Sequence, residues 1–328
     1  MIIISRCPYR VSLLGGSSDL DWYVNQNQYG IAIGFSIKLY TRVIITYRKS
    51  NDKGILNYSS REEYKDIESI SHPIIRSCFK KFNIKNKVEL CSIGESISGL
   101  GLGSSSSFSV ALINSISKLK SLNLTNKEIA HYASEIEIAD LKNPIGRQDQ
   151  YLCALGGVNV LKFKPNGEVS LSNQKLLSSA IENFSSKLYI VNTFITRSSK
   201  TKLTNLMKEN STLKLINDLR EIANKFIEKS KHLNRKDIEE LLEIYMKDAW
   251  DIKRKMYGVM TNKLLNIEKK ILKADFSVLK LLGAGGGGYF LVLFNGKNLE
   301  HSKSELENNG LKLIKIDISN EGCSTCIF

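Results

Sequence analysis

A glycine- and serine-rich stretch, GLGLGSSSSFSV at residues 99–110, combines two residue types that suit a bound anion. Glycine leaves the backbone open to a ligand, and serine adds hydroxyl groups beside exposed N–H groups. The stretch follows KVELCSI, which is typical of a strand, and precedes apolar residues at helical spacing from Phe108 to Leu119. Free N–H groups and the helix dipole would then face a phosphate. The sequence predicts a phosphate-binding loop, although an isolated run of this kind is more often a linker or a turn.

Two further stretches carry charged residues of the types that phosphoryl transfer requires. CPYRVSLLGGSSDLDWY contains Arg10, Gly15-Gly16 and Asp19, and EIADLKNPIGRQDQ contains Glu137 and Asp149. Taken singly, an Arg–Asp pair is usually a surface salt bridge, and a carboxylate between glutamines is usually part of a polar turn. With the loop, however, they supply a phosphate cradle, oxygen ligands for magnesium, a cation and a base.

The bulk composition is that of an ordinary globular protein of 328 residues, with 42% hydrophobic and 24% charged residues. The net charge of +14 is spread along the chain and interleaved with Glu and Asp, so we interpret it as solvated helix faces and expect no nucleic-acid partner. Neither a signal pattern nor an apolar run long enough for a membrane span is present in the sequence, and the six cysteines are scattered. These features predict a cytoplasmic protein without a membrane partner.

The pair CSTC, Cys323 to Cys326, has the spacing of half a zinc site or of a redox pair. A zinc site needs about four ligands, and the sequence has no second CxxC or HxxxH pattern. We therefore expect neither metal nor redox chemistry there.

The elements that position these residues read as an α+β chain. Extended patterns occupy residues 2–47, a capping box at Thr125–Glu128 starts a helix, and Asn-Gly in KPNGEV (164–169) predicts a hairpin. Amphipathic helices follow from 199 to 273, with Asn234 as a helix start, and KLLGAGGGGYFLVLF (280–294) reads as strand, glycine turn and strand. KLIKIDI (312–318) reads as a final strand. The predicted domains are residues 1–180 and 181–328.

Three of these stretches resemble the sequence motifs of one enzyme family. PYRVSLLGGSSD is similar to the first motif of the GHMP kinases, GLGLGSSSSFSVAL to the second, and LLGAGGGGYFLVL to the third, and they occur in the order and spacing of that family. The resemblance implies a two-domain fold, with an N-terminal ribosomal-protein-S5-domain-2-like domain and a C-terminal ferredoxin-like domain. It also implies ATP and Mg²⁺ as cofactors and a cytoplasmic phosphotransferase that acts on an alcohol group.

A narrower resemblance points to a substrate. NPIGRQDQYLCALGGVN and NTFITRSSKTKL look like segments of the D-glycero-D-manno-heptose 7-phosphate kinases. This implies phosphorylation of the anomeric C1 hydroxyl to give the 1,7-bisphosphate, for nucleotide-activated heptose and surface polysaccharide synthesis. The alternatives are a kinase for another sugar, fucose-like or a deoxyheptose, and a non-catalytic binding protein. We expect a small-molecule sugar or sugar-phosphate substrate and a monomer or homodimer.

The resemblance also assigns roles to individual residues. Asp149 would be the base, Arg10 would stabilise the transferring group and keep Asp149 ionised, and Ser105 with Glu137 would hold Mg²⁺. The nucleotide phosphates would lie against Gly99, Gly101, Leu102, Gly103, Ser104, Ser105, Ser106 and Ser107. The substrate would contact Asp19, Gly15, Gly16, Ser17, Arg147, Arg197 and Gly286.

The chain departs from the heptose kinase pattern near the expected sugar site. It has Gly15-Gly16-Ser17-Ser18-Asp19 where those enzymes usually have GGGTD, and Arg147 where they usually have lysine. A substrate 7-phosphate needs a second anion site, for which Arg147, Arg197 and Lys200 are the candidates. These departures keep the identity of the sugar open.

Overall fold

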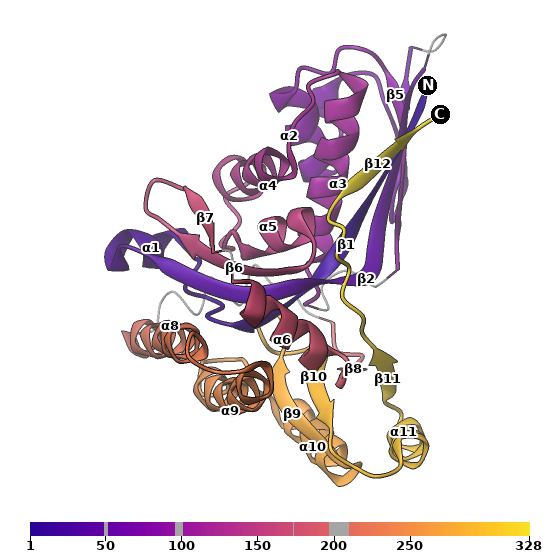
Figure 1. The fold of residues 1–328 in the computed structure, drawn as a ribbon. Coiled ribbons are helices and arrows are strands. Elements are labelled where there is room, and N and C mark those ends of the chain that lie inside the picture. Colours follow the sequence, from indigo (N-terminus) through magenta and orange to yellow (C-terminus); the bar gives the residue numbers. More distant parts are fainter. Residues whose placement is uncertain (49–51, 96–100, 173, 197–209) are drawn as a thin grey trace.

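The computed structural model describes the chain except for residues 49–51, 96–100, 173 and 197–209, and its strands form two sheets (Figure 1). The first sheet has the order β12-β1-β2-β5-β3-β4, and β6 pairs with both β2 and β7. The second has the order β11-β8-β10-β9. The strands of the first sheet are β1 (Ile2–Leu14), β2 (Gly30–Tyr47), β3 (Gly54–Asn57), β4 (Arg61–Tyr64), β5 (Val88–Gly94), β6 (Val158–Phe163), β7 (Val169–Ser172) and β12 (Ser324–Ile327).

β1 and β2 form a long antiparallel pair in the middle of the first sheet. Their β-branched and aromatic residues suit a pleated, half-buried surface, and the second half of β2 alternates between buried and partly exposed side chains. The register shifts between Pro8 and Tyr9, where proline has no N–H group to donate. β12 lies on the other side of β1, so residues at the end of the chain complete a sheet that the first residues begin.

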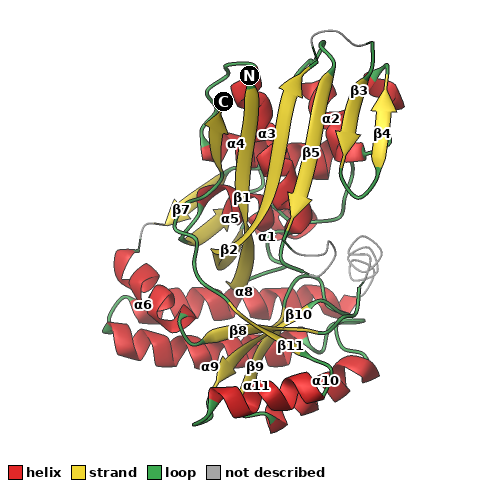
Figure 2. Cartoon of the chain, turned by 90° about the vertical axis from the view of Figure 1, so that its right-hand side faces the viewer, coloured by secondary structure: helices red, strands yellow, loops and turns green. Residues whose placement is uncertain are grey.

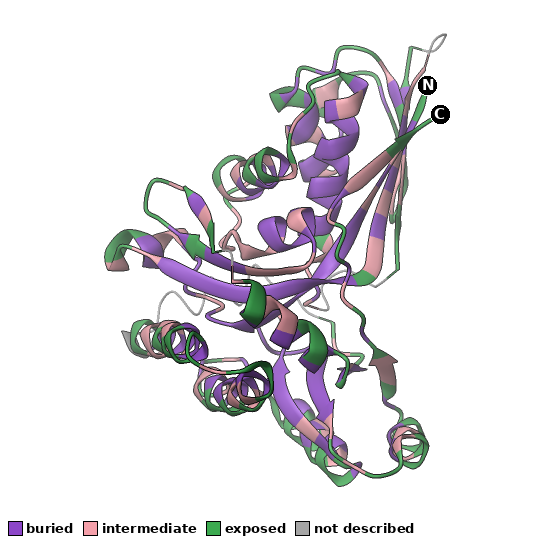
Figure 3. Cartoon of the chain, viewed as in Figure 1, coloured by how far each residue is buried: buried purple, intermediate pink, exposed green. Residues whose placement is uncertain are grey.

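Helices cover one face of the first sheet, as Figure 2 shows with the strands in front. α3 (Ser104–Leu119) is buried along most of its length (Figure 3), as its apolar spacing predicts. α4 (Asn126–Ser134) begins at the predicted capping box of Thr125 and Glu128. The other elements of this face are α2 (Pro73–Lys81), the short turn η1 (Ile67–Ser69), the π-helical η2 (Glu135–Asp140) and α5 (Gln148–Leu155), whereas α1 (Asp21–Asn27) follows the turn after β1 and contacts β2. The Asn-Gly hairpin is confirmed, because β6 and β7 pair across it.

The second half contains most of the remaining predicted elements, but the strand predicted over 312–318 ends at Lys315, and residues 199–209 of the predicted helical region lie outside the described residues. Strand, glycine turn and strand appear as β9 (Phe276–Leu281) and β10 (Tyr289–Phe294), and Asn234 caps its helix by accepting a hydrogen bond from the Asp237 backbone N–H. The other strands are β8 (Leu188–Asn192) and β11 (Lys312–Lys315). The accompanying helices are α6 (Lys175–Ser185), α8 (Asn210–Ser230), α9 (Arg235–Lys253), α10 (Asn262–Lys273) and α11 (Leu299–Asn308). The predicted domain boundary at 180/181 falls within α6 and stays a prediction.

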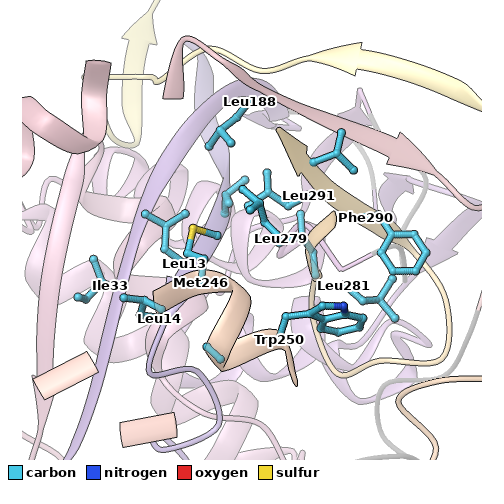
Figure 4. Packing of buried hydrophobic residues seen from close by; sticks show 14 of the residues in the cluster. Leu13, Leu14, Ile33, Leu188, Met246, Trp250, Leu279, Leu281, Phe290 and Leu291 are labelled. Atoms are coloured by element: carbon cyan, nitrogen blue, oxygen red, sulfur yellow. The ribbon is translucent and has the colours of Figure 1, made fainter. Parts of the chain in front are cut away.

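One hydrophobic cluster spans both sheets. Leu13 and Leu14 at the end of β1 belong to the same cluster as Met246 and Trp250 of α9 and Leu281 of β9 (Figure 4). α8 and α9 both contact β1. The end of β1 is therefore held between the two halves, and the residues beside it are placed where the halves meet. Within the described residues, no helix has the length and apolar character needed to span a bilayer.

Candidate functional site

A cavity of about 350 Å³ lies at this junction. Its lining comes from the end of β1, the start of α3, the segment around the start of α5, and the turn after β9. Five residues that the sequence analysis singled out from separate stretches meet here: Arg10, Asp19, Ser105, Glu137 and Asp149. The fold thus brings the three predicted motifs to a single cavity.

The glycine–serine stretch forms a tight approach to α3. Gly101 and Gly103 have positive φ angles of 86° and 74°, and Gly103 is the residue before the first turn of the helix. A Cβ atom on Gly101 would overlap the carbonyl oxygen of Leu282, so only glycine lets the loop pass this close to the second sheet. Gly101, Gly103, Ser104, Ser105 and Ser106 line the cavity.

Other predicted loop residues have a different placement. Leu102 is buried in the hydrophobic cluster, and the Ser107 hydroxyl donates to the Cys7 carbonyl at 2.9 Å. These two residues support the loop from behind. Gly99 lies outside the described residues.

Arg10 links the loop to Asp149. Its Nε donates to Asp149 Oδ1 at 2.6 Å, its Nη2 pairs with Oδ2, and its Nη1 donates to the Gly101 carbonyl at 2.6 Å. Burial acts to lower the pKa of Arg10, but the charge and hydrogen bonds of Asp149 outweigh it and raise that pKa above its ordinary value. The arrangement fixes a permanently charged cation and a carboxylate side by side.

Ser105 and Glu137 form a second polar pair. The Ser105 hydroxyl donates to Glu137 Oε2 at 3.0 Å, and Gln150 Nε2 donates to Oε1 at 3.0 Å. Glu137 sits in the π-helical turn η2, a distortion that often occurs at functional sites. Burial raises the pKa of Glu137, and among the described residues no basic side chain forms an ion pair with it. A buried carboxylate beside a hydroxyl suits a hard divalent cation such as Mg²⁺.

Asp19 is held both by its own loop and by the start of α5. Its Oδ2 accepts from the Gln148 backbone N–H at 3.0 Å, and its Oδ1 accepts from the Ser17 N–H and from Gln148 Nε2, both at 3.1 Å. Gly146 allows this contact, because a Cβ atom there would overlap the Asp19 carboxylate. Burial raises the pKa of Asp19 to about 6, against the opposing effect of the backbone hydrogen bond.

The loop that carries Asp19 is fixed by its small residues. Gly15 has φ of 75°, and the Ser18 hydroxyl donates to the carbonyls of Gly15 and Ile31. Gly16 and Ser17 line the cavity, and their contact with a substrate stays a prediction. Two buried oxygens beside them, Ser12 Oγ and Gln148 Oε1, have no hydrogen-bond partner among the described residues.

Two cationic residues of the lining were missed by sequence reasoning. Lys280 comes from β9, and Lys253 is the last residue of α9. Lys253 Nζ donates to the carbonyls of Leu281 and Gly283, and Lys280 Nζ donates to the carbonyl of Leu13 at 3.0 Å. Lys280 stands directly before the third glycine motif, so the only available signal was a lysine inside an otherwise apolar strand.

Four predicted substrate residues are not part of the cavity lining that the structure describes: Gly15, Arg147, Arg197 and Gly286. Arg147 lies behind the start of α5, where Nε and Nη2 donate to the two carboxylate oxygens of Asp21, each at 2.9 Å. Gly286 lies in the turn after β9, and its N–H donates to the Val259 carbonyl. Arg197, like Lys200, falls outside the described residues.

The cysteines at the end of the chain have separate surroundings. Cys323 is buried and accepts from Asn114 Nδ2, whereas Cys326 is exposed on β12. Among the described residues, no group of three or more His, Cys, Asp or Glu side chains is arranged to hold a metal ion.

Comparisons with known proteins show which protein families this chain resembles. Residues 71–157 match the sequence profile described as the GHMP kinases N-terminal domain. The D-glycero-alpha-D-manno-heptose 7-phosphate kinase of Campylobacter jejuni is 27% identical over 300 residues, which cover 88% of each chain. A mevalonate kinase of Pyrococcus horikoshii is 27% identical over 230 residues, 68% of this chain and 64% of that protein.

Solved structures show the same fold over nearly the whole chain. A D-glycero-D-manno-heptose 1-phosphate kinase from Bacteroides thetaiotaomicron superimposes with a TM-score of 0.78 at 19% identity and covers 99% of both chains. Lactococcus lactis galactokinase in complex with galactose gives a TM-score of 0.74 at 15% identity, covering 98% of this chain and 95% of the other. The expected fold is thus confirmed. The chain has a GHMP kinase N-terminal domain within a GHMP kinase fold, and it is a phosphotransferase that acts on a hydroxyl group.

Proposed function

We propose that this protein transfers the γ-phosphoryl group of ATP to the anomeric C1 hydroxyl of a heptose 7-phosphate and releases the 1,7-bisphosphate. The observation that carries the proposal is the Arg10–Asp149 pair beside the loop that precedes α3, within one cavity with Ser105 and Glu137. The names of the Campylobacter and Bacteroides relatives support a heptose as acceptor.

In the proposed reaction Asp149 accepts the proton of the acceptor hydroxyl. The hydroxyl oxygen forms a bond to the γ-phosphorus while the bond between that phosphorus and the bridging oxygen breaks, and ADP leaves. Arg10 holds the Asp149 carboxylate through two hydrogen bonds and adds positive charge beside the transferring group. Phosphoryl transfer depends mainly on positioning and charge stabilisation, and a partly buried ion pair held by two hydrogen bonds provides both.

The loop at the start of α3 would hold the nucleotide phosphates. The backbone N–H groups of the first turn of α3 have no partner within the helix, and the dipole of this 16-residue helix favours an anion there. Ser105 and Glu137 would hold Mg²⁺, which neutralises phosphate charge when it is bound. The turn after β9 would close this side of the cavity through Gly283 and Ala284.

The acceptor would lie against the wall formed by Asp19 and the start of α5. Sugar hydroxyls both donate and accept hydrogen bonds, and this wall offers the Asp19 carboxylate together with Ser12 Oγ and Gln148 Oε1. A buried polar atom without a partner is costly, and a bound sugar would supply the missing partner. The site therefore suits a polyhydroxylated acceptor.

A second candidate is a kinase of the same type for a sugar without a phosphate group. The pairing of Arg147 with Asp21 favours it, because this arginine already has a counter-charge. A merely sensory protein is less well supported, because Arg10, Ser105, Glu137 and Asp149 form the connected arrangement that catalysis needs.

The deciding experiment measures ADP release with Mg²⁺-ATP and D-glycero-D-manno-heptose 7-phosphate, beside the same heptose without its phosphate. Turnover with the phosphosugar alone is expected. Turnover with the free sugar would favour the second candidate, and silence with both and with a panel of hexoses would contradict a sugar kinase.

An arginine variant tests where the substrate phosphate binds. If Arg147 holds that phosphate, Arg147→Met raises KM for the phosphosugar and leaves KM for ATP unchanged. The matched control is Arg235→Met, because Arg235 is exposed on α9. An unchanged phosphosugar KM in Arg147→Met would remove this residue from the substrate site.

A further inference from the structure

Lys280 is a buried lysine that faces the cavity. It lies on β9 with 7% of its surface exposed, and its ammonium group donates one hydrogen bond, to the Leu13 carbonyl at 3.0 Å. Leu13 is the second-to-last residue of β1, the strand that leads into the turn with Gly16 and Ser17. Lys280 therefore reaches from the second sheet to the floor of the acceptor loop.

The charged groups around Lys280 do not neutralise the positive charge of its ammonium group. Arg10 from β1 and Lys253 from α9 are both cationic, and the carboxylates of the cavity lining are Asp19, Glu137 and Asp149. None of these carboxylates, nor any other in the described part of the chain, forms an ion pair with Lys280. Asp149 forms an ion pair with Arg10, and Asp19 accepts hydrogen bonds from the start of α5.

Burial, followed by the repulsion of Arg10, lowers the pKa of Lys280 to about 7. An ammonium group has three N–H donors, and one is used by Leu13. A side chain that only donated a hydrogen bond to the Leu13 carbonyl would not have to be lysine, because a neutral amide side chain donates equally well. A buried cation without a counter-charge is costly, so its presence beside a cavity indicates that an anion completes the site.

We propose that Lys280 is an anion-binding residue whose ammonium group contacts the terminal phosphoryl group of the bound nucleotide, and that its amine takes a proton from solvent when that group enters the cavity. The position of Arg10 indicates which phosphoryl group Lys280 would contact. Arg10 lies near Lys280 and contacts both the loop carbonyl of Gly101 and the proposed base Asp149, so the site of phosphoryl transfer is close to Lys280. The inference rests on the proposed nucleotide site at the start of α3, but not on the identity of the acceptor.

The test is calorimetric titration of the full-length protein with Mg²⁺-ATPγS, and separately with Mg²⁺-ADP, in buffers of different ionisation enthalpy. The dependence of the observed heat on the buffer gives the number of protons taken up. At about pH 8, where most Lys280 amines are neutral, we expect close to one proton to enter with ATPγS, and at about pH 6 close to none. ADP lacks the terminal phosphoryl group and should bind without this uptake.

Two substitutions separate charge from structure. Lys280→Gln keeps a donor for Leu13 but does not titrate, and Lys280→Met removes both properties. Both should abolish the uptake with ATPγS, and the loss of a charge-assisted hydrogen bond should weaken ATPγS about 10- to 100-fold at pH 6. Lys273→Gln, at an exposed lysine of α10, is the control and should match the wild-type protein.

The outcomes distinguish this inference from the proposed function. Uptake that persists in Lys280→Gln, uptake that is equal with ADP, or no binding of ATPγS would overturn the role of Lys280. Uptake that vanishes in Lys280→Gln supports it, even if no sugar is phosphorylated. Conversely, full turnover of heptose 7-phosphate with unchanged proton uptake in Lys280→Gln would leave the proposed function standing and remove this inference.

Discussion

Asp149 and Asp19 line the same cavity, but different groups hold them. Asp149 is paired with the guanidinium of Arg10, whereas Asp19 accepts hydrogen bonds from two backbone N–H groups and one amide. The first arrangement keeps a carboxylate oriented beside a cation, as a proton acceptor in phosphoryl transfer requires. The second leaves a carboxylate whose protonation is sensitive to burial.

Replacement of Asp149 tests its role as the base. Asp149→Asn keeps the size of the side chain but removes the proton acceptor, so kcat for acceptor-dependent ADP release should fall about 10²- to 10⁴-fold. The control is Asp248→Asn, because Asp248 is exposed on α9. ATPγS affinity, measured by calorimetry, should remain within a few-fold; a kcat close to wild type would exclude Asp149 as the base.

Asp19 should make acceptor binding pH-dependent. Its pKa is raised to about 6 by burial, so below that pH the carboxyl group loses its negative charge and one of its oxygens becomes a donor, which weakens the hydrogen bonds it accepts from Gln148 and from the sugar. The KM for the acceptor should therefore rise as the pH is lowered from about 7 to about 5. A KM that stays flat in the wild-type protein over this range would contradict the assignment, and Asp19→Asn should show a high, pH-independent KM.

The raised pKa of Asp19 also makes the stability of the folded protein depend on pH. Since the pKa of Asp19 is higher in the folded protein than in the unfolded chain, the folded state holds this proton more tightly. The contribution to the free energy of unfolding is present at low pH and is lost as the pH rises through about 6.

At the scale of elements, the loop before α3 and the turn after β9 depend on each other. Gly101 combines a positive φ with a backbone contact to Leu282. Gly310 has a positive φ of 73° as well, but no atom lies within 4 Å of the place that a Cβ atom would take there. The two glycines therefore allow conformational strain to be separated from steric overlap.

Gly101→Ala should lower nucleotide affinity, and Gly310→Ala should not. Both substitutions force alanine into the left-handed region, but only Gly101→Ala must also move the loop away from Leu282. We expect a loss of stability of about 1 kcal/mol for Gly310→Ala and roughly 1–3 kcal/mol more for Gly101→Ala. Urea unfolding and ATPγS titration measure the two effects, and equal affinities in the two variants would contradict the packing argument.

Elements with local signals were predictable from the sequence. The apolar spacing of α3, the capping box at Thr125, the cap at Asn234 and the Asn-Gly hairpin all lie within a few residues of the structure they specify. The pairing of β12 with β1 depends on residues more than 300 positions apart, and no local pattern contains it.

The site shows the same division. Motif residues such as Arg10, Ser105, Glu137 and Asp149 were found by type and spacing, although their roles stay predictions. Lys280 was missed, because only the packing of β9 against β1 brings its amine to the cavity. The ion pair of Arg147 with Asp21 was missed for the same reason, since the partners are 126 residues apart.

At the scale of the whole molecule, one of the two hydrophobic clusters contains residues of both sheets, and the other lies within the first half. Trp250 of α9 lies within the shared cluster, and Trp22 of α1 packs against it from the first half. A shared core couples the unfolding of its parts, because exposing one side removes the packing of the other.

Unfolding should therefore be a single transition. The chain has two tryptophans, so Trp22→Phe and Trp250→Phe each leave one fluorescent reporter, in opposite halves. Urea titrations of the two variants should give coincident midpoints after correction for the small stability change of each substitution, and should match the far-ultraviolet circular dichroism. Clearly separated midpoints in both variants would show that the halves unfold independently.

The pairing of β12 with β1 also affects how the protein is made. Ile2 and Phe328 exchange two backbone hydrogen bonds, and Ile3 faces Ile327. During synthesis β1 leaves the ribosome well before β12, so the outer edge of β1 stays open until β12 follows. An open edge invites pairing with other nascent chains, so the chain should be prone to aggregation until β12 covers β1, and a chaperone that shields strand edges should raise the soluble yield.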